Sequence, residues 1–536
     1  MFGTGASTSS YEDFHHTDVI LLFGSNAAEA HPIIFHHIMR GVRNGARLIV
    51  VDPRRTPTAL SAHSHLAINI GADIAVLNAL AHVIIQEGLA NTEFITRAVQ
   101  GFDRFRDAVA AWTPERAAAI AGVSAELLRD TARRYARADR AMLGWTLGIT
   151  EHHNAVDNVF ALINLALLTG HVGRPGTGLN PLRGQNNVQG GGDMGALPNR
   201  LAGFQDVRDP EVRARFERAW GVPLSPQPGW NQTGMFAAMG RGELQGLLVI
   251  GENPLASEAN GNHVRQLFGR LDALVVQDIF LTATAEIADV VLPARASFAE
   301  SDGTYTSSER RVQRVRAARQ APGQAQDDLW IVAALARAMG YDWASPEPEQ
   351  VFDEMRQLAP NFRGMTYARI EQEHGLQWPC PTEGHPGTKT LHTRLWEPVV
   401  NPKVALTPVE WEAPAETPTD AYPFMLTTGR RLAFYNTGVQ SNLYPHPHNT
   451  GERIEIHPAD ATRLGLADGE RVAVTSRRGR VEVPVRFSDT VAPGTVFMTF
   501  HFPDQVGTNL LSIDAFDPEA GTAEFKASAV RIERIG

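Results

Sequence analysis

Cysteine is almost absent from this sequence. The 536 residues include one cysteine, Cys380, which lies between two prolines in the segment 378–381. One cysteine cannot form an internal disulfide, a cysteine-rich zinc site or an iron–sulfur cluster, which needs about four ligands. We therefore expect Cys380 to be a structural or surface-loop thiol, and we predict no set of metal ligands in this chain.

Long apolar runs and an excess of positive charge are missing as well. No run reaches the ~18 apolar residues that a membrane-spanning helix needs. The formal net charge is −10, which argues against a general nucleic-acid-binding protein. The first residues contain neither the basic nor the apolar segment of an export signal. With 43% hydrophobic and 20% charged residues, the sequence predicts a globular protein of several domains, which we expect to be cytoplasmic.

The chain begins with the pattern of an α/β nucleotide-binding unit. We predict apolar strands over 18–23 and 47–51, joined by a turn at Gly24 and a helix over 32–43. Asp52 closes the second strand, and an acidic residue at this point is typical of a mononucleotide-binding half. The glycine fingerprint of nicotinamide- and flavin-binding proteins, Gly-x-Gly-x-x-Gly, is absent.

Two further turns of this unit carry glycine. We predict a strand over 66–70, after which Gly71 and Asp73 open a helix, with Asp73 as its N-cap. Another short strand is predicted over 141–144, with Gly148 just after it. Gly71, Asp73 and Gly148 are therefore candidates for binding a nucleotide.

The same pattern returns in the middle of the chain. A predicted strand over 247–250 is followed by Gly251 and Asn253, and a strand over 273–277 is closed by Asp278. The glycine and the aspartate are 28 positions apart in the first copy and 27 in the second. Threonines lie four and six residues after each aspartate: Thr56 and Thr58 in the first copy, Thr282 and Thr284 in the second. We infer two related halves, each binding one dinucleotide.

Between the two copies lies a segment, 180–195, with few large apolar side chains. It contains five glycines, a string of Asn and Gln, and one arginine, Arg183. Amides both donate and accept hydrogen bonds, which suits a heterocycle, and a guanidinium matches a carboxylate or phosphate. A flexible linker is the alternative, but the segment lacks the Ser, Glu and Lys that are typical of linkers. We predict a ligand-binding loop that is neither a core strand nor an amphipathic helix.

From about Thr417 the composition changes. We predict a strand over 422–430, a short helix over 458–464 and several short strands rich in β-branched residues, including 495–499. Hairpin signals separate these strands. The pattern indicates a small β-barrel-like domain with a loose tail over 500–516.

Several motifs together resemble the molybdopterin-dependent formate dehydrogenases, a group within the molybdopterin oxidoreductase family. The most specific is Arg183-Gly-Gln-Asn-Asn, and the resemblance covers the whole chain. The motifs occupy residues 183–189 with 193–195, 22–26 with 31–32, 51–54, 288–293, 428–430, 509–511, 517–518 and 524–526.

The resemblance implies a molybdenum or tungsten atom held between two molybdopterin guanine dinucleotides, one for each predicted half. It implies oxidation of formate to carbon dioxide, with two electrons leaving through an iron–sulfur cluster. Arg183 would be the catalytic residue that orients formate, beside Gly184, Gln185 and Asn186. The remaining cofactor-binding residues that it implies are Gly24, Asn26, Asp52, Arg54, Gly71, Asp73, Gly148, Gly251, Asn253, Asp278, Thr428, Gly429, Arg430, Asn509, Phe525 and Lys526.

The chain departs from this family at its front. Family members begin with a [4Fe-4S] domain and a metal-ligating cysteine or selenocysteine, and neither is found in this sequence. Glu151 stands where a glutamine is expected, and we expect the following His152 and His153 to be solvated or capping residues. The chain alone therefore cannot supply the thiolate ligand or the electron relay. Its expected partner is an electron-accepting iron–sulfur or flavin subunit, or an N-terminal region of its own.

The predicted fold is α/β, with two related doubly wound nucleotide-binding domains and a C-terminal, double-psi-like β-barrel. The predicted domains are 1–183, 184–297 (half of which would lie upstream), a bridging segment over 298–416, and 417–536. Two alternatives remain open: a truncated, non-catalytic relative that binds cofactor or acts as a scaffold, and another molybdopterin oxidoreductase of the nitrate reductase-like group.

Overall fold

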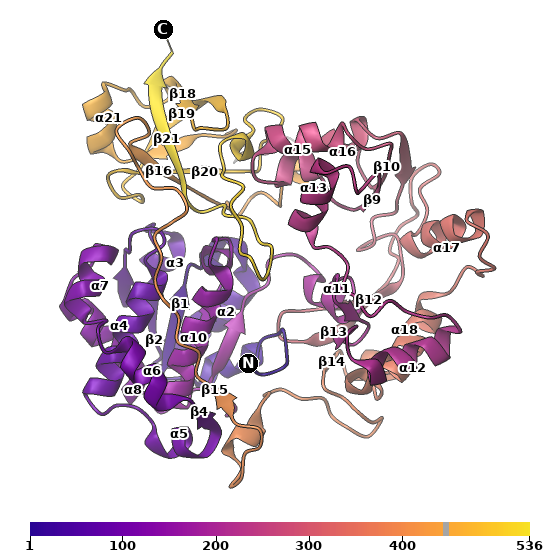
Figure 1. The fold of residues 1–536 in the computed structure, drawn as a ribbon, viewed down its shortest axis with the longest axis horizontal. Coiled ribbons are helices and arrows are strands. Elements are labelled where there is room, and N and C mark those ends of the chain that lie inside the picture. The colour runs from indigo at the N-terminus through magenta and orange to yellow at the C-terminus, as the bar shows by residue number, and fades with distance from the viewer. Residues whose placement is uncertain (443–446, 448–449, 536) are drawn as a thin grey trace. The chain divides into compact units, whose positions relative to one another are not determined.

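The computed structural model describes residues 1–442, 447 and 450–535. By its internal contacts the chain divides into two compact units (Figure 1). The first contains Met1–Leu182, Leu255–Arg265 and Thr390–Gly536, and the second contains Arg183–Pro254 and Gln266–Lys389. Two short helices cross the boundaries between these segments: α14 (Pro254–Ser257) and α15 (Gly261–Phe268).

The first unit is built around a parallel sheet in the order β3-β2-β1-β5-β6. Chain order reverses between β1 and β5, so the sheet is doubly wound around that point. Its strands are β1 (Val19–Phe23), β2 (Arg47–Val51), β3 (Ser64–Leu66), β5 (Ala141–Trp145) and β6 (Gly178–Pro181). The predicted strand over 66–70 is therefore wrong in its position, because only Leu66 belongs to β3.

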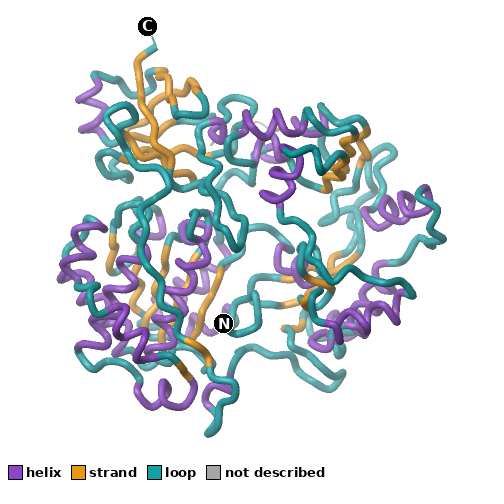
Figure 2. Tube along the Cα trace, viewed as in Figure 1, coloured by secondary structure: helices purple, strands orange, loops and turns teal. Residues whose placement is uncertain are grey.

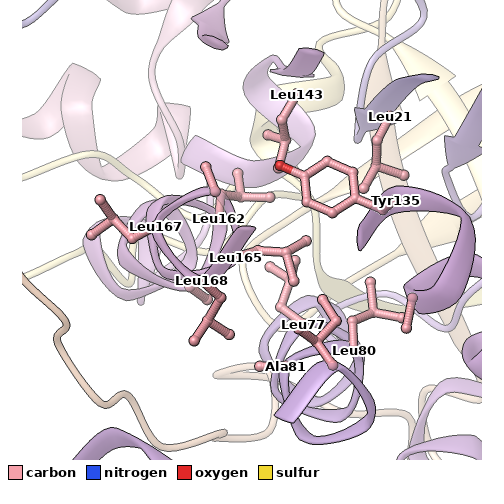
Figure 3. Close-up of a cluster of buried hydrophobic side chains, with 14 of the residues drawn as sticks. Leu21, Leu77, Leu80, Ala81, Tyr135, Leu143, Leu162, Leu165, Leu167 and Leu168 are labelled. Atoms are coloured by element: carbon pink, nitrogen blue, oxygen red, sulfur yellow. The ribbon is translucent and has the colours of Figure 1, made fainter. Parts of the chain in front are cut away.

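Both faces of this sheet are buried, as parallel sheets require. On one face, alternate residues of the strands pack against α4 (Asp73–Gln86), α8 (Ala125–Arg137) and α10 (Ala155–Thr169). Figure 3 shows this cluster, with Leu21, Tyr135 and Leu143 among the leucines of α4 and α10. The other face packs against α2 (Pro32–Arg43), which begins and ends where the sequence predicts.

Several helix ends follow the sequence signals. Thr113 and Ser124 cap the following helices through their side chains, as N-cap residues of this type do. Asp73 is an exception, because it is the first residue of α4 and Ala72 is the N-cap. The remaining elements of this part are η1 (Tyr11–His16), α1 (Ala27–Ala30), α3 (Pro57–Leu60), α5 (Thr92–Ala98), β4 (Val99–Gln100), α6 (Phe102–Val109), α7 (Pro114–Ala121), α9 (Leu147–Thr150), η3 (Thr393–Trp396) and β15 (Val404–Ala405).

The C-terminal part of the first unit is a closed barrel in the order β16-β20-β17-β19-β18-β21. Alternate residues of its strands point inward, such as Val481, Val483 and Val485 of β19. Its elements are β16 (Phe424–Gly429), α20 (Val439–Asn442), β17 (Ile454–Ile456), α21 (Pro458–Leu464), β18 (Arg471–Thr475), β19 (Arg480–Phe487), β20 (Thr495–Thr499), η4 (Thr508–Leu510) and β21 (Ser528–Arg534). The predicted fold class, α/β with a C-terminal barrel, is confirmed.

The second unit contains a smaller parallel sheet, in the order β11-β10-β9, and an antiparallel sheet, β12-β13-β14 (Figure 2). The strands are β7 (Arg200–Leu201), β8 (Gln205–Asp206), β9 (Gly246–Ile250), β10 (Ala273–Asp278), β11 (Val290–Pro293), β12 (Gly303–Thr306), β13 (Arg311–Val315) and β14 (Leu376–Gln377). The helices are α11 (Val188–Asp193), α12 (Pro210–Trp220), α13 (Gln232–Gly240), α16 (Ala283–Glu286), α17 (Asp328–Ala338), α18 (Pro348–Leu358), η2 (Pro360–Phe362) and α19 (Tyr367–Gln372). Among the described residues, no helix combines the length and the hydropathy needed to cross a membrane.

One face of the smaller parallel sheet is bare on its two outer strands, β9 and β11. Leu248 and Ile250 of β9 are 42% and 49% exposed, and Val290 of β11 is 47% exposed. At the matching positions of the first unit, Leu21 and Phe23 are fully buried under helices. The second copy of the sheet therefore presents apolar strand residues to solvent.

We expect this bare face to bind an apolar fluorescent dye, because contiguous exposed apolar surface behaves as an interaction site. Replacing Leu248 and Ile250 by lysine should remove most of the dye signal without lowering the melting temperature. Val399→Lys is the control, since Val399 is an exposed valine of the first unit, outside the bare face, and its replacement should leave the signal unchanged. Equal dye binding by all three proteins would contradict the assignment.

Candidate functional site

Two glycines meet at the point where strand order reverses in the first unit. Gly24 follows β1 and Gly148 lies in α9 after β5, and Gly148 N donates to Gly24 O at 3.2 Å. A Cβ on Gly24 would lie 2.7 Å from backbone atoms of Gly148, so neither position has room for a side chain. In doubly wound sheets, ligands bind at this carboxyl edge. The two glycines form a cradle of bare backbone there.

Two buried carboxylates lie at the same edge. Asp52, directly after β2, accepts a hydrogen bond from Arg54 N at 2.9 Å through Oδ1. Burial raises the pKa of Asp52, although Arg54 opposes the shift. Burial likewise raises the pKa of Asp73 to about 6. The guanidinium of Arg54 stacks over the ring of Phe497 at 3.5 Å, which holds one cation beside these acids.

The two predicted halves have matching backbone hydrogen bonds at the turn after the first strand of each half. Gly24 N donates to Val51 O, and Gly251 N donates to Gln277 O, both at 2.8 Å. Gly251 has a φ of +63°, in the left-handed region that glycine tolerates. The first turn is pressed against Gly148, whereas a Cβ on Gly251 would meet no described atom within 4 Å.

The aspartates and threonines repeat as well. Asp278 Oδ1 accepts from Phe280 N at 3.0 Å, as Asp52 does from Arg54. The Asn–Thr bonds also recur: Thr58 Oγ1 donates to Asn26 Oδ1 at 3.0 Å, and Thr284 Oγ1 donates to Asn253 Oδ1 at 2.7 Å. Thr56 and Thr282 both cap the next helix by accepting a backbone N–H at 3.2 Å. The equal offsets in the sequence therefore correspond to the same set of hydrogen bonds in both copies. The residue that donates its backbone N–H to the aspartate is Arg54 in the first copy and Phe280 in the second.

A buried ion pair joins the C-terminal tail, defined as residues 511–527 between η4 and β21, to the first unit's sheet. His152 Nδ1 lies 3.0 Å from Glu524 Oε1, and its Nε2 lies 3.1 Å from Gly148 O. Both neighbours accept hydrogen bonds, so both ring nitrogens donate and the ring is an imidazolium. Of the two roles expected for His152, solvation is wrong, because its side chain is buried against Glu524, whereas capping agrees with its hydrogen bond to Gly148 O of α9. His153 also contacts Glu524, through its backbone N–H at 3.1 Å.

The pKa values of this pair move apart. Burial alone would lower the pKa of His152, but the charge and the hydrogen bond of Glu524, together with the charge of Asp73, outweigh burial and raise it. Burial would raise the pKa of Glu524, but His152 and the hydrogen bonds from both histidines lower it to about 2. Through Gly148 O, the ion pair also supports the glycine cradle.

The predicted residues of the barrel lie beside this pair. Lys526 Nζ forms a 2.6 Å ion pair with Glu151 and donates to Thr428 O at 3.1 Å. Thr428 Oγ1 donates to Phe525 O at 2.9 Å. Glu151, at a position where the family resemblance leads us to expect glutamine, therefore has a lysine as its counter-charge.

Arg430 and Gly429 continue the same strand end. A Cβ on Gly429 would lie 2.8 Å from the Phe497 ring and 3.5 Å from Arg54. Arg430 stacks over Phe500 at 4.7 Å, and burial lowers its pKa. Among the described residues, its buried Nη1 has no hydrogen-bond partner. A buried guanidinium nitrogen of this kind suits an anionic ligand.

Two of the predicted cofactor-binding residues, Gly71 and Asn509, make contacts within the protein. Gly71 packs against Pro414, and its carbonyl accepts from Trp411 Nε1 at 2.9 Å. Asn509 Nδ2 donates to the carbonyls of Ala256 and Ser257, both at 2.9 Å. These contacts give both residues a structural role at the edge of the site.

Residues 183–193, here called the Arg183 segment, lie in the second unit and are held there by hydrogen bonds at Arg183 and Asn187. Arg183 N donates to Ser308 Oγ at 3.0 Å, and Asn187 Oδ1 accepts from Thr306 N at 2.9 Å. Gly184 and Asn186 are exposed, whereas Gln185 is half-buried. Burial lowers the pKa of the half-buried Arg183. The flexible-linker alternative does not fit a segment held in this way.

The prediction of a loop throughout 180–195 is wrong in two places, because Asn180 and Pro181 end the strand β6 and part of the rest is helical. Residues Val188–Asp193 form α11, despite three consecutive glycines. A hydrogen bond from Gln189 Nε2 to Asp193 Oδ1, at 2.9 Å, spans one helical turn and stabilises it. Apolar periodicity gives no sign of α11, because buried polar side chains stabilise this helix.

Trp378, Arg310 and Ser308 also shape this region, and sequence reasoning missed all three. Cys380 is buried beside them, with Arg369 Nη1 at 3.5 Å from its sulfur. Across the part of the chain that the structure describes, no group of three or more His, Cys, Asp or Glu side chains could hold a metal ion.

A dinucleotide fits the first unit on three observations. The glycine cradle lets a ligand reach bare backbone, Asp52 and Asp73 offer buried acceptors, and Arg430 offers a buried donor. The second copy repeats the turn and the aspartate, in a unit of its own.

Comparison with known proteins points in the same direction. The family model "Molybdopterin oxidoreductase" matches residues 3–338, and "Molydopterin dinucleotide binding domain" matches residues 424–529. The F420-dependent formate dehydrogenase 2 subunit alpha of Methanococcus maripaludis is 44% identical over 544 residues, with 100% of this chain and 79% of the relative covered. Formate dehydrogenase H of Escherichia coli is 37% identical over 541 residues, with 99% and 75% covered.

A solved structure, acetylene hydratase from Pelobacter acetylenicus, matches with a TM-score of 0.72 at 19% identity, covering 99% of this chain and 79% of that chain. At this identity the likeness concerns the fold alone. The family model, however, spans more than half of the chain, and the two formate dehydrogenases are covered over more than two thirds of their length. The chain therefore belongs to the molybdopterin oxidoreductase family and is related to its formate dehydrogenases.

Proposed function

We propose that this chain is the catalytic portion of a formate dehydrogenase, which oxidises formate to carbon dioxide, one proton and two electrons. The observation that carries the proposal is the anchored Arg183-Gly-Gln-Asn-Asn segment. Its guanidinium belongs to a half-buried side chain whose backbone is fixed to Ser308. Relatives that share 37–44% of this sequence are named formate dehydrogenases.

Arg183 would bind the carboxylate of formate through its planar fork and hold it in one orientation. Gln185 and Asn186, with Gly184 between them and the arginine, would offer amide groups beside it. As formate becomes neutral carbon dioxide, its attraction to the guanidinium is lost, so the same residue favours release of the product.

The cofactor that we propose is molybdenum or tungsten between two molybdopterin guanine dinucleotides. When bound, the metal would supply an acceptor for two electrons. Asp52 would accept from guanine or ribose donors of one nucleotide, with Arg54, Arg430 and the glycine cradle close to its phosphates. Asn26 holds the turn in place through Thr58. Asp73, Thr428, Gly429, Phe525 and Lys526 line the same edge.

In the second unit, Asp278 would play the part of Asp52, and Gly251 and Asn253 would form the turn. We propose an iron–sulfur or flavin partner, or a further region of the protein, as the next electron carrier. This chain carries one cysteine and therefore ligates no [4Fe-4S] cluster by itself. The predicted domains, 1–183, 184–297, 298–416 and 417–536, remain part of the proposal.

Two nucleotide-binding halves predict a fixed stoichiometry. We expect the cofactor-loaded protein to release about two guanine nucleotides per metal atom after acid treatment, one for each half. Chromatography of the released nucleotides beside metal analysis measures the ratio. Adenine nucleotide only, a ratio near one, or no nucleotide at all would contradict the two-half assignment. Formate-dependent dye reduction by the same sample separates formate dehydrogenase from the two alternatives.

A further inference from the structure

A buried polar cluster lies at the end of the Arg183 segment and has no role in the proposed function. Asp193 closes α11 and is almost fully buried, as are Gln189 and Trp378. One carboxylate oxygen accepts from Gln189 Nε2 at 2.9 Å, and the other accepts from Trp378 Nε1 at 2.8 Å. Two buried donors thus depend on one carboxylate, and a buried donor that loses its acceptor is destabilising.

Trp378 is itself held in place by hydrogen bonds to Arg310. Arg310 is fully buried and has a φ of +68°, which is uncommon for a residue with a side chain. Its guanidinium donates to the carbonyls of Trp378, Thr388 and Lys389. Trp378 N in turn donates to Arg310 O at 3.2 Å. Asp193 therefore connects α11 to a rigid part of the second unit.

Asp193 is also a counter-charge for Arg183. Each of the two groups favours the charged form of the other, and Arg310 acts on Asp193 in the same direction. Burial works against the negative charge and raises the pKa of Asp193 to about 6. The carboxylate thus combines a mechanical contact with an electrostatic one.

We propose that Asp193 is a positioning residue for Arg183: through its hydrogen bonds to Gln189 and Trp378 it anchors the end of the Arg183 segment. The role of Arg183 in binding formate rests on the proposed function. The anchoring does not, because it depends only on contacts within the second unit.

Three substitutions separate the hydrogen-bond contacts of Asp193 from its charge. In Asp193→Asn, the new amide oxygen can still accept a hydrogen bond from Trp378 Nε1. The new NH₂ group then faces the side chain of Gln189. Gln189 Oε1 is buried and has no hydrogen-bond partner among the described residues. Gln189 can therefore turn its amide and accept that NH₂ group, so the asparagine keeps the anchor and removes the charge. Asp193→Ala removes both. Trp378→Phe removes one donor and keeps the charge.

Hydrogen exchange of the backbone amides over 183–193, followed by mass spectrometry, reports on the anchor. We expect exchange in the cofactor-loaded protein to become roughly tenfold faster or more in Asp193→Ala, since the segment can then open locally. Trp378→Phe should increase exchange to a smaller extent, and Asp193→Asn should stay within about twofold of the wild type. Asp209→Ala removes an exposed helix cap of the same unit and should leave exchange over 183–193 unchanged.

Unchanged exchange in both Asp193→Ala and Trp378→Phe would overturn the anchoring. If Asp193→Ala accelerates exchange while Arg183→Lys leaves formate turnover normal, the anchoring holds and the proposed function fails. The two proposals are therefore tested by different measurements.

Discussion

Replacing Arg183 by lysine should reduce formate turnover by roughly 10²-fold or more, with metal and nucleotide content unchanged. Lysine keeps one positive charge but loses the planar fork that holds both oxygens of a carboxylate. Loss of a charge-assisted contact at a reacting group costs on the order of 2–4 kcal/mol, by analogy with the loss of an oxyanion donor. Formate-dependent dye reduction, measured beside metal content, gives the result.

Arg241→Lys is the matched control. Arg241 is a half-exposed arginine of the same unit, whose fork holds both oxygens of Glu243 at 2.9 and 2.7 Å. A surface pair of this kind contributes little, so its loss should not change turnover. If Arg183→Lys and Arg241→Lys were equally active at normal metal loading, Arg183 would not lie in the formate site.

Breaking the ion pair between His152 and Glu524 should have the largest effect on stability. In Glu524→Gln the imidazolium loses its buried counter-charge, and removal of one partner of a buried pair costs about 3–5 kcal/mol. His152 can release its proton, so we expect the lower end of this range. Thermal unfolding monitored by calorimetry should show a melting temperature several degrees lower. Less nucleotide should also be retained, because the pair supports the carbonyl of Gly148.

The contribution of this pair depends on pH in a defined direction. The raised pKa of His152 means that its stabilisation is fully present below its ordinary pKa of 6.5 and is lost as the pH rises through the raised value. The lowered pKa of Glu524 means that its stabilisation is present above its ordinary pKa of 4.5 and is lost as the pH falls through about 2. The difference in melting temperature between wild type and Glu524→Gln should therefore be largest from pH 4.5 to 6.5.

Glu519→Gln provides the comparison for this experiment, because Glu519 is an exposed carboxylate of the same tail. It should melt like the wild type at every pH. A Glu524→Gln protein with the same melting temperature and the same pH profile as Glu519→Gln would show that the buried pair contributes no net stability.

The parts of the fold that local signals specify could be predicted from the sequence. Apolar runs predicted β1 and β2, and the helix predicted over 32–43 has the same bounds as α2, because signals of this kind act on the neighbouring backbone. The offsets between Gly24 and Asp52, and between Gly251 and Asp278, predicted a repeated unit, and its hydrogen bonds follow the same offsets.

The long-range contacts could not be predicted in this way. His152 looked like a surface residue because Glu524, its partner, is 372 positions away in the chain. Asp193 and Trp378 are 185 positions apart, and nothing local to either residue indicates their hydrogen bond. Asp73 was predicted to cap a helix from its residue type, but burial placed it in the first turn instead. Side chains whose partners come from another segment need the fold before their role can be read.

The difference between Arg54 and Phe280, which occupy the same place in the two copies, has a consequence for ionic strength. If each half holds one nucleotide, as proposed, the first half adds a cation beside its aspartate and the second adds an aromatic ring. Dissolved salt screens the attraction of a cation over a distance of about 8–10 Å, but it leaves the contact of a ring unchanged. Rising salt would therefore weaken the first half before the second, so two chemically identical ligands would dissociate in a fixed order.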